Sequence, residues 1–445
     1  MLSRLLPFLL ATTTAILAQT DRAKYLASGD TIRGVNLGGW LLTERWITPS
    51  VYRGTGAYDE WHLCASLGRS SCRSLLERHW DSFYTYDDLA DIKAAGLNSL
   101  RIPVGYWAVD LADYEPYTNG QYPYLVRLIL WAKMLGLSAS IDLHGLPGSQ
   151  NGQDNSGLTG GVYFAANSSN TDRGLQVLGN LSREFSGDQY GGVVKSIELM
   201  NEPRIGGSSS FSMDQLKAFY TAGIKTVRDS SGGKLSATIH DAFYGPSYWR
   251  YYDPTSTTAS SPVNYVAIDT HQYYAFPPLQ NLTQSVILQS VCNISKILKG
   301  TSGIPRINVG EWSLETGNAH ETTSTTYANS QEKRTWLRKL FEAQLAAYTP
   351  NGPNQPSGGW YYWTWKTEND IDTWSYRRGV WDGYIPKDVS NASTLAFPLR
   401  SDGCIDDTFA YQAPSRPGSA RAARRWIGWA GTTAVGLAVA AICVM

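Results

Sequence analysis

The feature that most constrains the fold is a repeated alternation of short apolar runs with helical patterns. Two of the intervening stretches, 86–95 and 125–135, are amphipathic and stop at Gly96 and Gly136, where glycine commonly ends a helix. Strands that alternate with helices pair in parallel, so eight such repeats predict an α/β fold of the (β/α)8, or TIM, barrel type. The eight runs are residues 31–37, 98–104, 137–144, 196–200, 235–240, 265–271, 306–309 and 359–365.

An open doubly wound sheet is the alternative fold. It is less well supported, because no glycine-rich phosphate loop opens a helix after the first run. No low-complexity linker divides residues 19–410, and we therefore expect a single catalytic domain over that range.

Both ends of the chain have the pattern of processing signals. Residues 1–18 combine Arg4, an apolar run and a small residue, as a secretory signal peptide does. Residues 411–425 are a linker and spacer that includes Arg421, Arg424 and Arg425, and 426–445 form a hydrophobic tail with no polar residue after it. This order predicts a glycosylphosphatidylinositol anchor signal, with a retained tail anchor or stop-transfer helix as the alternative.

Charge and cysteine content fit a secreted chain. Removal of both ends leaves 34 of the 38 basic side chains against 38 acidic ones. The mature protein is then slightly acidic and has no basic run, so we expect no nucleic-acid partner. Loss of Cys443 with the tail leaves an even number of cysteines, for which we expect Cys64–Cys72 and Cys292–Cys404 disulfides. Five glycosylation sequons begin at Asn167, Asn180, Asn281, Asn293 and Asn391.

Two glutamates end apolar runs and carry the main chemical prediction. Glu202 follows Asn201 and precedes Pro203, and Glu311 lies between Gly310 and Trp312. Two carboxylates that face one pocket can cleave a glycosidic bond if one donates a proton while the other stays ionised. For Glu202 to be the donor it needs a raised pKa, which burial and the charge of Glu311 are expected to supply.

Further polar and aromatic residues end other runs. Arg101 can hold a nucleophilic carboxylate ionised, and Asn201 can donate to a sugar hydroxyl. His144 and His271 each follow an Asp-X pair, and Trp365 can stack on a pyranose. A metal centre and a serine triad are the alternatives. The chain has no His-Glu-X-X-His or Cys-X-X-Cys motif for a metal and no Gly-X-Ser-X-Gly elbow for a triad, so we expect neither, and no cofactor.

Several blocks together resemble the fungal exo-β-1,3-glucanases of glycoside hydrolase family 5. They include 34–40, 100–107, 142–152, 201–203, 271–273, 310–313 and 359–368. The resemblance covers about residues 30–405, and it implies a β-glucan substrate. With the processing signals at both ends, we expect a monomeric enzyme at the cell surface. The resemblance implies Glu202 as acid/base and Glu311 as nucleophile, with Arg101, His144, Asn201, His271 and Tyr273 around the cleaved bond. It also implies that Glu44, Asp154, Asn155 and Trp365 hold the terminal glucose.

The chain departs from this family at the pocket entrance. Phe276 matches one of two expected phenylalanines, but Gln153 stands where the other is expected. The residues after Ser313 also differ from the family's usual continuation. A preference for β-1,6 linkages or other β-glucosides therefore stays open, as does a catalytically silent wall-binding protein.

Overall fold

The computed structural model describes residues 23–207, 211–250, 252, 266–300, 305–317 and 330–414. The predicted signal segment and hydrophobic tail lie outside these residues. Within them, no helix combines the length and apolar character needed to cross a membrane.

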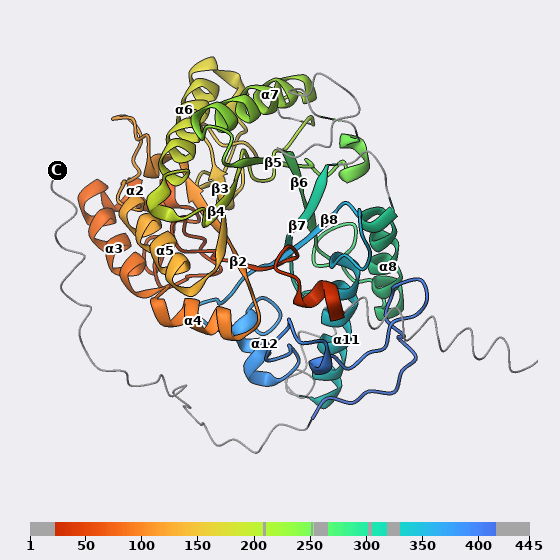
Figure 1. Ribbon diagram of the computed structural model, residues 1–445. Coiled ribbons are helices and arrows are strands. Elements are labelled where there is room, and N and C mark those ends of the chain that lie inside the picture. The colour runs from red at the N-terminus through yellow and green to blue at the C-terminus, as the bar shows by residue number, and fades with distance from the viewer. Residues whose placement is uncertain are drawn as a thin grey trace, which may run out of the picture. The chain divides into compact units, whose positions relative to one another are not determined.

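Eight parallel strands form a closed barrel, each paired with the next and the last paired with the first (Figure 1). The prediction of a (β/α)8 barrel is confirmed. The strands are β1 (Ile32–Asn36), β2 (Ser99–Gly105), β3 (Ser138–Gly145), β4 (Val194–Glu198), β5 (Ser236–His240), β6 (Val266–Gln272), β7 (Arg306–Trp312) and β8 (Ser357–Tyr362).

Helices surround the barrel and cover the apolar outer side of its strands (Figure 1). The predicted helix at 86–95 forms with a capping box, in which Thr85 and Asp88 bond each other's backbone N–H groups. The helices are α2 (Glu60–Leu67), α3 (Arg69–Ser82), α4 (Tyr86–Ala94), α5 (Tyr122–Leu135), α6 (Ser168–Phe185), α7 (Met213–Ser230), α8 (Gln284–Gly300), α11 (Gln331–Tyr348) and α12 (Tyr376–Asp382).

The inside of the barrel is polar. Ser99 on β2 and Tyr361 on β8 share a hydrogen bond of 3.0 Å between their hydroxyls, and Arg101 bonds Glu198 at 2.8 Å. Alternate residues of the same strands, such as Leu100 and Ile102, are fully buried. Since side chains alternate along a strand, the apolar set faces the helices while the polar set supports the C-terminal rim.

Two strands end at other positions than the sequence predicts. β4 stops at Glu198, four residues before Glu202, whereas β7 extends to Trp312 and includes Glu311. The backbone after β4 still follows its neighbours, because Leu199 donates to Thr238 and Asn201 to Leu143. Glu202 itself has a φ of 45°, so it belongs to a tight turn above the barrel.

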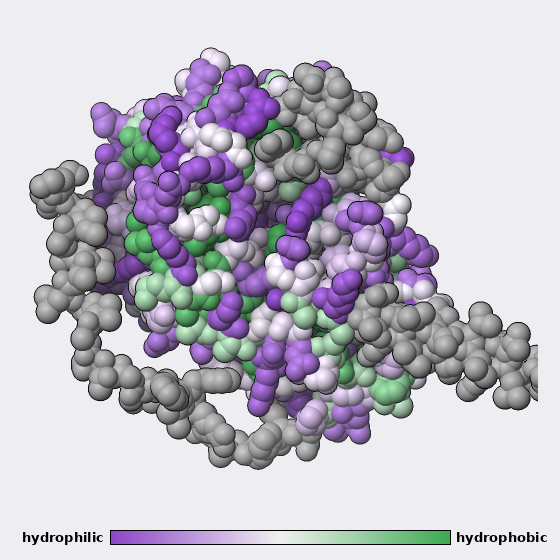
Figure 2. All heavy atoms as spheres, viewed as in Figure 1, coloured by the Kyte–Doolittle hydropathy of each residue, from purple (hydrophilic) through white to green (hydrophobic). Residues whose placement is uncertain are grey.

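Both predicted disulfides form. Cys64–Cys72 joins α2 to α3, and Cys292–Cys404 joins α8 to the segment after α12. The face drawn in Figure 2 mixes hydrophilic side chains with scattered apolar ones over its described residues, as a water-exposed surface of outward helix faces should.

Candidate active site

A cavity of about 910 Å³ opens at the C-terminal end of the barrel. Residues at or after the ends of seven of the eight strands contribute to its wall, which is where barrels of this type place their chemistry. Its lining consists of Glu44, Trp46, His144, Gln153, Asp154, Asn155, Glu202, Phe243, His271, Tyr273, Phe276, Pro277, Pro278, Leu279, Glu311, Trp363 and Trp374.

Glu311 accepts a hydrogen bond on each of its carboxylate oxygens. Arg101 Nη1 donates to Oε1 over 2.7 Å, and the Tyr273 hydroxyl donates to Oε2 over 2.8 Å. Burial raises the pKa of Glu311, while the charges of His271 and Arg101 oppose that rise. Donors on both oxygens favour the ionised form and fix the direction of the carboxylate.

Glu202 is held by one side chain from β6 and one from the segment after β3. His271 Nδ1 lies 2.7 Å from its Oε1, and Asn155 Nδ2 donates to its Oε2 over 2.8 Å. Burial would raise the pKa of Glu202, but the hydrogen bond and charge of His271 outweigh it and lower that pKa to about 2. The expected raised pKa of Glu202 is therefore wrong, because the sequence did not reveal a cationic histidine in contact with it.

His271 lies between the two carboxylates. Its Nδ1 is 3.5 Å from Glu311 Oε2 as well as 2.7 Å from Glu202 Oε1. Because both distances start at the same nitrogen, Glu202 Oε1 and Glu311 Oε2 cannot be further apart than the sum of the two. This upper limit is compatible with the about 5–5.5 Å between the carboxyl groups of retaining glycosidases. Burial opposes a charge on His271, but Glu311 and Asp269 raise its pKa well above its ordinary value.

Arg101 is the centre of a buried network below the cavity. Besides Glu311, it lies 2.8 Å from Glu198, 3.1 Å from Asp142 and 3.5 Å from Asp269. Four carboxylates around one guanidinium fix its orientation and hold it charged. The acidic members of this network, apart from Glu311, were not predicted as site residues, although Asp142 and Asp269 are the acids of the two Asp-X-His patterns.

Asn201 and His144 connect this network to the cavity. Asn201 Oδ1 accepts from Arg101 over 2.9 Å, and its amide nitrogen lies 3.3 Å from His144 Nε2. His144 Nδ1 lies 2.5 Å from Asp142 Oδ2. Asn201 and Arg101 are fully buried and lie below the lining rather than in it.

Glu44, Asp154 and Asn155 form one polar side of the cavity. Glu44 accepts from the indole of Trp46 over 2.9 Å, and Asn151 donates to Asn155 over 3.0 Å. Burial and the neighbouring Asp154 raise the pKa of Glu44 well above its ordinary value. Such closely placed acids can accept and donate hydrogen bonds with several sugar hydroxyls at once.

The predicted role of Trp365 is wrong. Trp365 is buried outside the cavity lining, where its ring stacks on Tyr376 and its indole nitrogen lies 3.4 Å from Asp88. Trp363 lines the cavity instead and lies parallel to His144, with ring centroids 5.6 Å apart. β8 ends at Tyr362, so the first residue after the strand, and not the third, faces the cavity.

The entrance carries further aromatic rings. Phe276 and Gln153 both line the cavity, as the sequence led us to expect, and both are exposed. Trp374 lies against Tyr273 and Phe276, with centroid distances of 5.6 Å and 6.3 Å. Trp46, Phe243 and Trp374 were not predicted, since single aromatic residues in loops carry no periodic signal.

Comparisons with known proteins agree with this geometry. The profile of the family described as cellulase (glycosyl hydrolase family 5) matches residues 69–369. A glucan 1,3-beta-glucosidase of Blumeria graminis is 34% identical over 432 residues, which cover 87% of this chain and 95% of that protein. Glucan 1,3-beta-glucosidase 1 of Schizosaccharomyces pombe is 34% identical over 403 residues, covering 85% and 93%.

Among solved structures, the fold resembles that of the rutinosidase from Aspergillus niger. The two share a TM-score of 0.66 and 24% sequence identity, over 80% of this chain and 98% of that one. This likeness concerns the fold, whereas the family profile and the curated relatives extend over most of the sequence. On that evidence, the chain belongs to glycosyl hydrolase family 5.

Proposed function

We propose that the protein is a retaining, exo-acting β-1,3-glucan hydrolase that releases glucose from non-reducing ends. The observation that carries this proposal is that Glu202 and Glu311 line one cavity and both approach Nδ1 of His271, at 2.7 Å and 3.5 Å. The curated relatives that match most of the chain are glucan 1,3-beta-glucosidases.

In the first step, a carboxylate oxygen of Glu311 attacks the anomeric carbon of the terminal glucose. The bond from that carbon to the glycosidic oxygen breaks, and Glu202 protonates the departing oxygen. Arg101 and Tyr273 orient Glu311, and they keep its charge available until the glycosyl ester forms.

The proton for this step is held by the His271–Glu202 pair. His271 is the protonated partner before the reaction, and one transfer from Nδ1 to Oε1 across 2.7 Å converts Glu202 into the acid form. In the second step, Glu202 removes a proton from water as that water attacks the anomeric carbon and breaks the ester with Glu311.

The terminal glucose would occupy the polar side formed by Glu44, Asp154 and Asn155, with Trp363 beneath its apolar face. An indole at this position supplies apolar contact area, and the acids supply directional hydrogen bonds. Removal of single units from a chain end is supported by the curated relatives, which are glucan 1,3-beta-glucosidases.

The linkage preference is tested by product analysis on two polymers. Laminarin has β-1,3 linkages and pustulan has β-1,6 linkages. We expect glucose from laminarin, first formed as the β-anomer by NMR, at a higher kcat/KM than from pustulan. A higher kcat/KM on pustulan would favour a β-1,6 preference, the alternative left open by glutamine at position 153. If neither polymer nor an aryl β-glucoside is turned over, the protein would instead be a catalytically silent wall-binding protein.

We also propose that the protein acts outside the cell, attached by a lipid anchor. The two disulfides support an oxidising compartment. Arg421, Arg424 and Arg425 before the tail oppose a spanning orientation, and the 16 mostly apolar positions from 430 to 445 fall short of the about 20 residues needed to span a bilayer. Phosphatidylinositol-specific phospholipase C should release active enzyme from membranes, whereas Cys443 in a peptide map of the membrane-bound protein would show a retained tail.

A further inference from the structure

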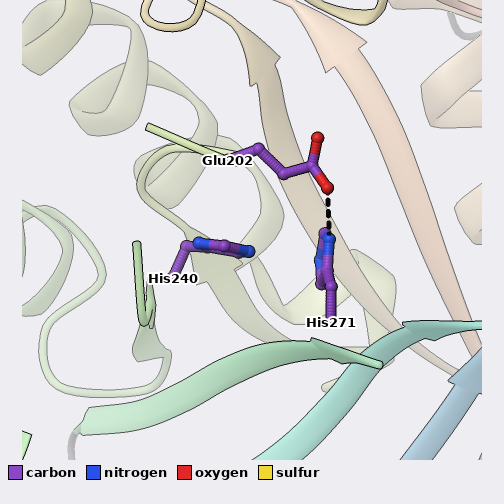
Figure 3. A group of neighbouring side chains, drawn as sticks. All are labelled: Glu202, His240 and His271. Atoms are coloured by element: carbon purple, nitrogen blue, oxygen red, sulfur yellow. Dashed lines mark hydrogen bonds and ion pairs between the residues drawn. The ribbon is translucent and has the colours of Figure 1, made fainter. Parts of the chain in front are cut away.

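His240 is a buried histidine next to the catalytic pair that the proposed mechanism does not use. It ends β5 and has no exposed surface. Its ring meets that of His271 edge to face, with centroids 4.4 Å apart. One nitrogen of His240, one of His271 and one oxygen of Glu202 all lie within 4.8 Å of one another, and Figure 3 shows the outer nitrogen of His240 directed toward the other two side chains.

The protonation of His240 follows from its backbone contact. The N–H of Ala242 donates to His240 Nδ1 over 3.0 Å. A backbone N–H can only donate, so Nδ1 must be the acceptor and the hydrogen of the neutral ring lies on Nε2. The group of Glu202, His240 and His271 therefore does not offer a metal ion three lone pairs, since the inner nitrogen is occupied and the outer one carries hydrogen.

Nε2 of His240 is a buried donor without a hydrogen-bond acceptor among the residues that the structure describes. Buried polar groups are nearly always paired, and a catalytic role is one of the explanations for an exception. The loop that holds this ring is itself strained, because Ala242 and Phe243 have φ angles of 53° and 62° although neither is glycine. Backbone strain and an unpaired buried donor both occur at functional sites.

A positive charge on His240 is opposed by its surroundings. Burial and the charge of His271 lower the pKa of His240 to about 3. The ring thus stays neutral, and it supplies a fixed dipole rather than a second exchangeable proton. The other titratable or charged groups that face the three-residue cluster are Glu44, Arg101, His144, Asp154, Glu198, Asp241, Asp269, Tyr273 and Glu311.

We propose that His240 is a positioning residue for Glu202, and that its Nε2–H stabilises the carboxylate form of the Glu202–His271 pair and holds that pair in line with the scissile bond. The inference rests on the proposed glycosidase function. It predicts that loss of this one N–H makes the pair retain its acid proton to higher pH and positions Glu202 less well for protonating a leaving group.

Two amide substitutions separate the two nitrogens of His240. The shorter side chain of His240→Asn can replace Nδ1 as the acceptor for Ala242, but it removes the Nε2 donor. The longer side chain of His240→Gln places an amide N–H near Nε2 but leaves Ala242 without its acceptor. A structural role acts through Nδ1, whereas the proposed role acts through Nε2.

The measurement is the pH profile of kcat/KM on laminaribiose and on 2,4-dinitrophenyl β-glucoside, with thermal unfolding in parallel. In His240→Asn we expect a nearly unchanged Tm and a larger loss of kcat/KM on laminaribiose than on the activated glucoside. The basic limb of the pH profile should move up by about one pH unit, which corresponds to about 1.4 kcal/mol of lost electrostatic stabilisation. In His240→Gln we expect the wild-type limb with a lower Tm.

The inference is overturned if both variants keep the wild-type limb, or if the limb moves in His240→Gln and not in His240→Asn. An equal limb shift in both variants, tracking their loss of Tm, would also overturn it by assigning His240 a structural role. An inactive wild-type enzyme on both substrates would contradict the proposed function itself.

Discussion

The hydroxyl of Tyr273 donates a hydrogen bond of 2.8 Å to Oε2 of Glu311. Since a hydrogen bond to a charged group contributes about 1.5–3 kcal/mol, Tyr273→Phe should lower kcat/KM roughly ten- to one-hundred-fold. The matched control is Tyr274→Phe, because Tyr274 is also buried but interacts with Tyr348 instead. Equal activity of the two variants would contradict the assigned orientation of Glu311.

The two tryptophans after β8 should behave differently when each is replaced by phenylalanine. Trp363→Phe removes part of the ring that lines the cavity, so KM should rise several-fold, in keeping with the about 0.5–1.5 kcal/mol of a ring contact. Trp365→Phe removes the indole contact with Asp88 and should lower the free energy of unfolding by about 1 kcal/mol with little change in KM. A rise in KM only in Trp365→Phe would instead support Trp365 as the residue that stacks on the terminal glucose.

Which tryptophan after β8 faces the cavity could not be predicted from the sequence. Alternation along an extended strand puts residues 363 and 365 on the same side, so the sequence does not distinguish them. Only the end of β8 at Tyr362, and the turn that follows, decides which indole faces the cavity. The eight strands, in contrast, were predictable because their apolar runs and intervening helices repeat along the whole chain.

Glu202 illustrates a second limit. Its place beyond β4 could be predicted from Asn201 and Pro203, but its φ of 45° could not. Its contact with His271 joins two residues that are 69 positions apart in the sequence. The lowered pKa of Glu202 depends on that contact. Local sequence patterns do not encode such a distance, whereas the family resemblance did place both residues in one site.

The stability contributed by Glu202 should depend on pH. Its pKa falls from an ordinary 4.5 to about 2 in the folded protein, so its ionised form stabilises the fold above pH 4.5. That stabilisation is lost as the pH falls through 2, because folded and unfolded states are then equally protonated. The Tm difference between wild type and Glu202→Gln should therefore shrink between pH 4.5 and 2.

The exposed Glu332→Gln on α11 is the control for loss of one negative charge. A Tm difference for Glu202→Gln that stays constant or grows over the same pH range would contradict the ionised contact with His271.

Gln153 should weaken the leaving-group side of the cavity. A flexible amide must lose rotamer freedom to contact sugar, while an aromatic face is already fixed. Gln153→Phe should therefore lower KM for laminari-oligosaccharides more than for an aryl β-glucoside. Phe276→Gln should raise KM, again more for laminari-oligosaccharides than for the aryl β-glucoside. Equal effects on both substrates would refute the position assigned to Gln153.

The central claim is that Glu311 forms a covalent bond with glucose. A 2-deoxy-2-fluoro-β-glucoside with a good leaving group should trap this ester. The fluorine slows both the formation and the hydrolysis of the ester, whereas the good leaving group speeds only its formation, so the ester accumulates. Mass spectrometry of proteolytic peptides should then locate one added fluoroglucosyl group on Glu311. A label on Glu202, or turnover that releases the α-anomer without any label, would contradict the account.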